Sequence, residues 1–242
     1  MASGGAVRAD AAALAARLGL VRARDLVPAP PATAGGAAIP APRTLAVTAD
    51  IAPLLPGAGM AASTAIGAGA TGALALLWRL LAGPTTAGLW CAVLGLRGIY
   101  PLAAAAAGAD LDRLAFVDAA GPRIGDAANA LADGLAALVL PSAALTPAQT
   151  RRLAGKARRA GCALIWWETR HVPGVDARLD VAAARWQGLR ANTGRYWGAG
   201  ELDAVELEVR AAWRSGRGAL ERLWPYGGAP QAPSNVIALR RR

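Results

Sequence analysis

The chain has 242 residues and a formal net charge of +10, and its basic side chains are almost all arginine, since Lys156 is the only lysine. A hydrophobic content of 55% excludes a disordered chain, and two cysteines are too few for a disulfide scaffold. This length suffices for one packed domain of about 200 residues plus its ends. Cys91 and Cys162 lie in apolar runs, which predicts buried, reduced thiols in a cytosolic protein.

The first segment, residues 1–26, predicts an amphipathic helix built from alanine, leucine and arginine. Residues 27–42 are rich in proline, alanine and glycine, which indicates an extended linker. A folded core is expected over 43–226, followed by a disordered basic tail over 227–242 that ends in three arginines.

Residues 51–78 contain no charged side chain, and a run of this length could span a bilayer. Two prolines and five glycines interrupt it, however, and most of its apolar residues are alanine, so a membrane span is not expected. A buried strand over 61–66, a glycine turn over 67–72 and a helix over 73–82 are predicted instead.

The remaining elements alternate between apolar strands and single helices. We expect strands over 88–95, 114–117, 136–140 and 162–167, and helices over 101–108, 124–135 and 147–160. This alternation is typical of βαβ units, so the fold class is α/β with a mostly parallel sheet covered on both faces. Two further strands with polar alternation are expected near 179–186 and 202–213.

Positive charge and tryptophan gather in the last third of the chain. Residues 1–150 carry a net charge of +1 and residues 151–242 carry +9, together with six of the eight tryptophans. Interleaved cations and rings suit single-stranded nucleic acid, and they are found at Arg185, Trp186, Arg190, Arg195 and Trp197. The alternative is that the tryptophans fill the core while the arginines face solvent.

Two other charged groups have simpler interpretations. The helix over 147–160 places four arginines mostly on one side, as a docking face for an acidic partner or as a solvated face: Arg151, Arg152, Arg158 and Arg159. Glu206 and Glu208 alternate with apolar residues, which predicts the solvated face of an edge strand.

The turn after the first core strand has the glycine spacing of a phosphate-binding loop. That loop has a glycine, four residues, a glycine, a lysine and then a serine or threonine. The residues here are Gly67, Gly69, Thr71, Gly72, Ala73 and Leu74. The lysine position is therefore alanine and the hydroxyl position is leucine, so the loop is vestigial, or it is an ordinary tight turn.

No other constellation predicts catalysis. His171 is the only histidine, which excludes multi-histidine metal sites, and it is expected in an exposed loop. No metal ligand set and no nucleophilic triad has a convincing context.

The order of several motifs resembles the RecA-like core, and more closely the truncated, degenerate ImuA-type (SulA-like) relatives of actinobacterial mutagenesis cassettes. The resemblance covers roughly 43–225. Its carriers are the 67–74 loop, 91–94 as the second core strand, 139–147 as the Walker-B strand with its Ala-Leu-Thr-Pro, and 164–170 as the strand that ends in the nucleotide-sensing glutamine.

This resemblance implies a RecA-like three-layer sandwich with an N-terminal helix on a proline-rich linker, but the chain departs from the family at each catalytic position. The Walker-B aspartate falls on Pro141, the catalytic glutamate near Leu96 or Arg97, and the sensing glutamine on or beside Thr169. The first DNA-binding loop is also shortened. Positioning and charge stabilisation supply nearly all of phosphoryl-transfer catalysis, so we expect a pseudo-ATPase with no catalytic residue and no cofactor.

The resemblance also implies a function and partners. It points to a cytoplasmic, nucleoid-associated accessory protein of damage-induced (SOS) translesion synthesis. The partners would be an ImuB-like Y-family polymerase homologue, RecA, an error-prone DnaE-type polymerase and single-stranded DNA, with self-association through residues 1–26. Two alternatives stay open: a SulA-like cell-division inhibitor, and a nucleotide-binding ATPase with atypical phosphate ligands.

Overall fold

A computed structural model describes residues 44–119, 121, 123–188 and 204–228. The helix expected over 1–26, the linker over 27–42 and the tail from residue 229 onward lie outside these residues.

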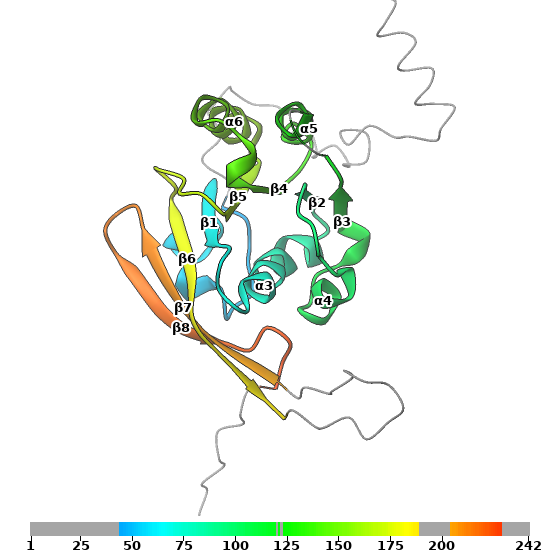
Figure 1. Ribbon diagram of the computed structural model, residues 1–242. Coiled ribbons are helices and arrows are strands. Elements are labelled where there is room, and N and C mark those ends of the chain that lie inside the picture. The colour runs from blue at the N-terminus through cyan, green and yellow to red at the C-terminus, as the bar shows by residue number, and fades with distance from the viewer. Residues whose placement is uncertain (1–43, 120, 122, 189–203, 229–242) are drawn as a thin grey trace, which may run out of the picture.

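The described residues form one mixed sheet of eight strands in the order β3-β2-β4-β5-β1-β6-β7-β8 (Figure 1). Neighbouring strands from β3 to β6 are parallel, and β7 pairs antiparallel with both β6 and β8, which confirms the mostly parallel sheet. The strands are β1 (Ser63–Gly67), β2 (Cys91–Leu94), β3 (Leu114–Val117), β4 (Ala137–Pro141), β5 (Ala163–Glu168), β6 (Ala177–Gln187), β7 (Ala204–Trp213) and β8 (Gly218–Leu223).

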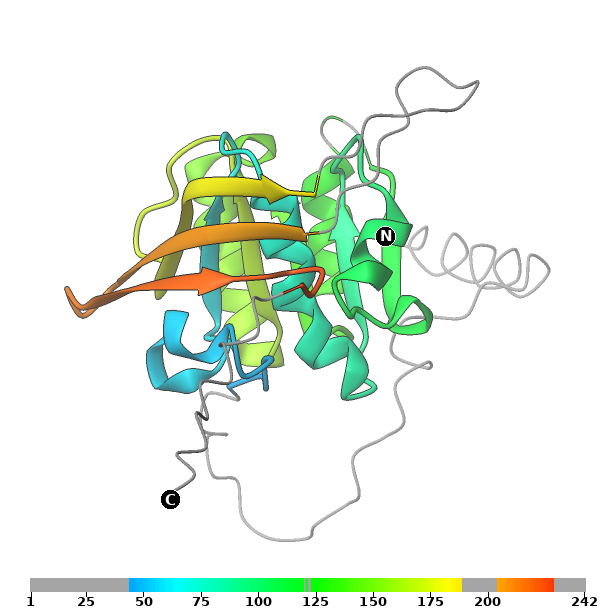
Figure 2. The ribbon, with the colours of Figure 1, turned by 90° about the horizontal axis from the view of Figure 1, so that it is seen from below.

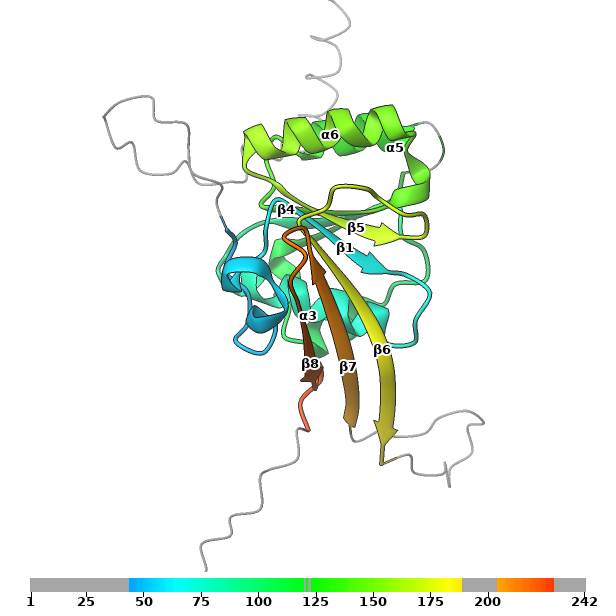
Figure 3. The same ribbon diagram turned by 90° about the vertical axis from the view of Figure 1, so that its left-hand side faces the viewer.

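Helices cover both faces of the parallel part of the sheet. Figure 3 shows α5 and α6 on one face and α3 on the other, in agreement with two separate hydrophobic clusters. The helices are α3 (Ala73–Thr86), α4 (Pro101–Ala106), α5 (Arg123–Leu131) and α6 (Pro147–Ala160). Short 3-10 turns are η1 (Ala52–Leu54), η2 (Pro56–Ala58), η3 (Leu111–Arg113) and η4 (Ser142–Ala144).

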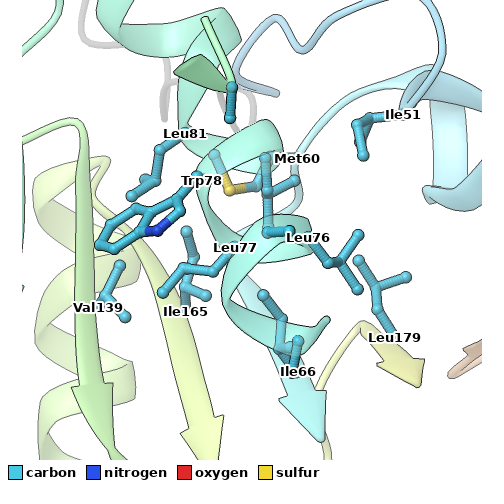
Figure 4. Close-up of a cluster of buried hydrophobic side chains, with 14 of the residues drawn as sticks. Ile51, Met60, Ile66, Leu76, Leu77, Trp78, Leu81, Val139, Ile165 and Leu179 are labelled. Carbon is cyan, nitrogen blue, oxygen red and sulfur yellow. The ribbon is translucent and has the colours of Figure 1, made fainter. Parts of the chain in front are cut away.

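The charge-free run forms the centre of the larger core cluster. Leu76, Leu77 and Trp78 of α3 are fully buried and pack toward β-strand side chains such as Ile66 and Ile165 (Figure 4). A helix buried on most sides is apolar around its circumference, which explains the lack of charge. Within the part of the chain that the structure describes, no helix is long and apolar enough to cross a membrane.

Helix α6 has the predicted bounds because both of its ends carry clear signals. The Thr146 hydroxyl accepts a hydrogen bond from the Gln149 backbone N–H, and the Gln149 side chain accepts one from the Thr146 N–H, which forms a capping box. Pro147 occupies the first helical position, and Gly161 ends the helix with a positive φ of 74°. The strand predicted over 114–117 is likewise confirmed as β3.

Other predicted bounds were wrong by a few residues. Helix α3 continues past residue 82 through Pro84 to Thr86. A proline in the last turn removes only one backbone hydrogen bond, and the Thr85 hydroxyl donates to the Leu81 carbonyl. Helix α5 ends at Leu131 rather than residue 135, and β2 begins only at Cys91.

Strands β6, β7 and β8 extend the sheet past β1 and lie side by side in Figure 2. Their inner residues, among them Val205, Leu207 and Val209, join the cluster around α3. The sequence did not predict β8, in which exposed and partly buried residues alternate. Its presence makes β7 an interior strand.

Both cysteines and two of the seven described tryptophans, Trp78 and Trp166, are buried. Cys91 and Cys162 are buried and free, and burial raises the pKa of each thiol to about 12. Trp166 is fully buried and donates its indole N–H to the Ser63 hydroxyl, and Trp213 donates to the Leu54 carbonyl. The core interpretation is confirmed for Trp166, whereas Trp213 is only partly buried.

Candidate functional site

The vestigial loop lies where the sequence placed it, between a central parallel strand and a helix. Gly67 ends β1, Ala73 begins α3, and Gly72 caps the helix with a φ of 90°. Ligands of open α/β sheets bind at the carboxyl ends of the parallel strands. The positions that follow β4, β5 and β2 meet at this same edge, namely Pro141, Thr169, Leu96 and Arg97.

The two positions that hold phosphate and metal in such a loop point into the core. Ala73 is buried, and Leu74 is partly buried against the cluster around α3. A Cβ atom at Gly72 would lie 2.5 Å from Cδ2 of Leu207, so β7 packs directly against the loop. The loop therefore presents neither an ammonium group nor a hydroxyl at these positions. Nothing lies within 4 Å of a Cβ atom placed on Gly69, and the side chain of Thr71 is exposed.

An ion pair crosses β1 on the sheet face that α5 and α6 cover, which is the face opposite α3. Arg178 of β6 donates from Nε and Nη2 to the two carboxylate oxygens of Glu168 on β5, at 2.7 and 2.8 Å. Strand β1 lies between them, with Gly67 opposite Glu168 and Ala65 opposite Arg178. A Cβ atom at Gly67 would collide with Oδ1 of the neighbouring Asp180.

Glu168 is held as a carboxylate. Burial by itself raises the pKa of Glu168, but hydrogen bonds from Arg178 and from the Val172 N–H, with the Arg178 charge, outweigh it and hold this pKa below its ordinary value of 4.5. The same bonds raise the pKa of Arg178. His171 lies in an exposed loop, as predicted, with Nδ1 3.6 Å from Glu168.

Further hydrogen bonds join the ends of β4 and β5. The buried Ser142 hydroxyl donates to the Arg170 carbonyl at 2.6 Å and accepts from the Arg170 N–H at 2.8 Å. The Arg170 guanidinium donates to the Ser142 and Leu145 carbonyls. The ends of β4 and β5 are therefore joined by hydrogen bonds between protein groups. Among the described residues, no group of three or more histidine, cysteine or acidic side chains could hold a metal ion.

The predicted nucleic-acid patch is only partly described. Trp186 is 47% exposed on β6, whereas Arg190, Arg195 and Trp197 lie outside the described residues. The Arg185 guanidinium lies 3.1 Å from a Glu206 oxygen and 3.9 Å from a Glu208 oxygen. The positive charge of Arg185 is thus compensated within the sheet.

The prediction that Glu206 and Glu208 form the solvated face of an edge strand was wrong. Strand β7 is flanked by β6 and β8, and Glu206 is only 9% exposed between Arg185 and Arg222. Their alternation with apolar residues is real, but the arginines of the two neighbouring strands cover the carboxylate. The prediction was wrong because β8, which pairs with β7, was not predicted from the sequence.

The four arginines of α6 lie on one exposed face, opposite the buried Leu153. In the portion of the chain described, no carboxylate forms an ion pair with Arg151, Arg152, Arg158 or Arg159, while Lys156 beside them pairs with Asp133 at 2.8 Å.

Local sequence patterns did not indicate Arg178, Asp180 or Ser142. Arg178 follows Glu168 by only ten residues, but the two lie on strands that β1 separates in the sheet, and only the strand order shows that they pair. The single available signal was the carboxylate Glu168 at the end of an otherwise apolar strand.

Comparison with known proteins gives two matches. The family described as MT3502 N-terminal domain matches residues 53–174, which contain β1 to β5 and end before β6. The chain is also similar to the uncharacterized protein Rv3395c of Mycobacterium tuberculosis, with 32% identity over 151 residues, or 60% of this chain and 72% of that protein.

Proposed function

We propose that this chain, which belongs to the MT3502 N-terminal domain family, is a non-catalytic adaptor with a degenerate RecA-like core. In this proposal it serves damage-induced translesion synthesis by holding an ImuB-like Y-family polymerase homologue together with RecA or DNA. An error-prone DnaE-type polymerase would be recruited to the same complex.

One observation carries the non-catalytic part of the proposal. The turn from β1 to α3 has the strand–loop–helix layout of a phosphate site, yet Ala73 is buried and Leu74 packs against the core cluster around α3. A P-loop enzyme needs a lysine on the β- and γ-phosphates and a hydroxyl on Mg²⁺. Phosphoryl transfer depends on these positioned charges, so their joint replacement favours a binding role.

The translesion part rests on the ordered resemblance of the loop and strands to ImuA-type relatives. The layout supports it, because the four segments that carry the resemblance form neighbouring parts of one sheet edge: the 67–74 loop, β2, β4 and β5. Function is a property of sites rather than folds, so this part requires a binding experiment.

That experiment is retention of purified candidate partners by the immobilised full-length protein after nuclease treatment. We expect retention of the Y-family polymerase homologue from the same organism, unchanged by ATP and Mg²⁺, because no nucleotide site controls the surface. Retention of the division tubulin alone would support the SulA-like alternative, and retention of neither protein would contradict the adaptor role.

A further inference from the structure

Three groups of arginines on the described surface differ in how their charges are compensated. Arg185 lies against Glu206 and Glu208. In the β7–β8 turn, Arg217 stacks on the Trp213 ring at 5.7 Å and Arg214 lies 3.9 Å from Asp176. The third group, which we call the α6 arginine face, consists of Arg151, Arg152, Arg158 and Arg159, and no described carboxylate pairs with it.

The α6 arginine face is a regular array. Arg151 and Arg158 are seven residues apart, as are Arg152 and Arg159, so each pair recurs after two helical turns, or about 10.5 Å along the axis. All four side chains are exposed, and the residues between them on this side are small, namely Ala148 and Gly155. The face therefore offers guanidinium groups with no apolar side chain between them.

Helix stability does not explain half of this array. Arg158 and Arg159 in the last turn interact favourably with the helix dipole, but Arg151 and Arg152 lie in the second turn, where the dipole has fallen off and gives them no stabilisation. Arg152 and Lys156 are also like charges at the i,i+4 spacing, which destabilises a helix. The capping box and Pro147 stabilise α6 despite these charges.

We propose that the α6 arginine face binds the phosphate backbone of nucleic acid. Guanidinium groups match phosphate geometry, and backbone contacts need charge rather than apolar anchors. A protein partner would instead require a desolvated centre with aromatic or large apolar anchors, which this face lacks. This inference rests on the proposed adaptor function. It names α6, rather than the region around Arg185, as the surface that binds nucleic acid.

The test measures binding of the full-length protein to a fluorescent single-stranded oligonucleotide by anisotropy over a range of salt concentrations. One variant replaces all four arginines of the α6 arginine face by glutamine. The matched control replaces four other exposed arginines by glutamine, Arg97, Arg123, Arg214 and Arg217, so both variants carry the same net charge.

For single strands, the slope of log K against log salt changes by about 0.7 for each phosphate contact. We therefore expect the α6 variant to lose up to about 3 units of slope and at least about tenfold in affinity at moderate salt, while the control keeps the wild-type slope. Equal losses in both variants would show a net-charge effect and overturn the proposal, as would a wild-type protein that does not bind.

Two further readouts separate this role from others. An Arg151→Gln, Arg152→Gln variant should melt at the wild-type temperature or above, whereas a structural role would lower the Tm. Polyglutamate should compete poorly with the oligonucleotide, and equal, α6-dependent binding of polyglutamate would overturn the choice of nucleic acid. Because polymerase retention is measured after nuclease treatment, failure here is distinguishable from failure of the adaptor proposal.

Discussion

Substitution of Glu168 by alanine is expected to lower the free energy of unfolding by about 3 kcal/mol, measured by urea denaturation at neutral pH. Removing one partner of a largely buried pair leaves the other charge without compensation, which is the costly case. The side chains of Glu168 and Arg178 are only 10% and 25% exposed, and the pair is bidentate. The Val172 N–H would lose its acceptor as well.

The Arg178→Ala variant and the double variant complete the test. If the two side chains stabilise the fold mainly through each other, the double variant loses clearly less stability than the sum of the single losses. Losses below 1 kcal/mol that simply add would mean that the pair behaves as an ordinary surface ion pair.

A Glu168→Gln variant extends this series to the pH dependence of stability. Because the folded-state pKa of Glu168 is lowered, its contribution is present above the unfolded pKa near 4.5 and is lost as pH falls through the folded value. The stability difference between wild type and Glu168→Gln should therefore be full at pH 7 and shrink below about pH 4.5. A difference that grows on acidification would contradict the assignment.

Substitution of Gly72 by alanine is the second large effect, with an expected loss of about 3 kcal/mol in the free energy of unfolding. A left-handed backbone costs an L-residue about 1–2 kcal/mol, and a Cβ atom here would also press on Leu207 at 2.5 Å. Circular dichroism during chemical denaturation measures the loss.

Gly69 provides the matched control in the same loop. It has no positive φ and nothing lies within 4 Å of its would-be Cβ atom, so Gly69→Ala should be neutral or slightly stabilising. Equal effects at Gly69 and Gly72 would mean that the packing of β7 against the loop is not what requires glycine at position 72.

Continuous apolar runs made the parallel half of the sheet predictable from sequence. Strands buried on both faces have this composition, and single helices between them fix the βαβ order. Helix α6 was predicted with its observed bounds because Thr146, Pro147 and Gly161 mark both ends. The vestigial loop was placed between its strand and helix because glycine spacing is a local feature.

Features that depend on which strands lie side by side in the sheet could not be predicted. The Glu168–Arg178 pair requires the strand order β5-β1-β6, which no local pattern encodes. The burial of Glu206 requires Arg222 from β8, a strand of alternating exposed and partly buried residues with weak signal. Both of these features are ion pairs between strands, and hydrophobic periodicity does not indicate which charged residues will pair.

The measurement that tests the central claim most directly is titration of the purified protein with ATP and Mg²⁺, followed by calorimetry, thermal melting and phosphate release. A ligand that binds the native state stabilises it according to its concentration relative to Kd. Because Ala73 and Leu74 stand where the loop needs a lysine and a hydroxyl, we predict no binding heat, superimposable melting curves at millimolar ATP, and no hydrolysis. Hydrolysis or stabilisation that a Gly69→Asp variant abolishes while remaining folded would contradict the non-catalytic account.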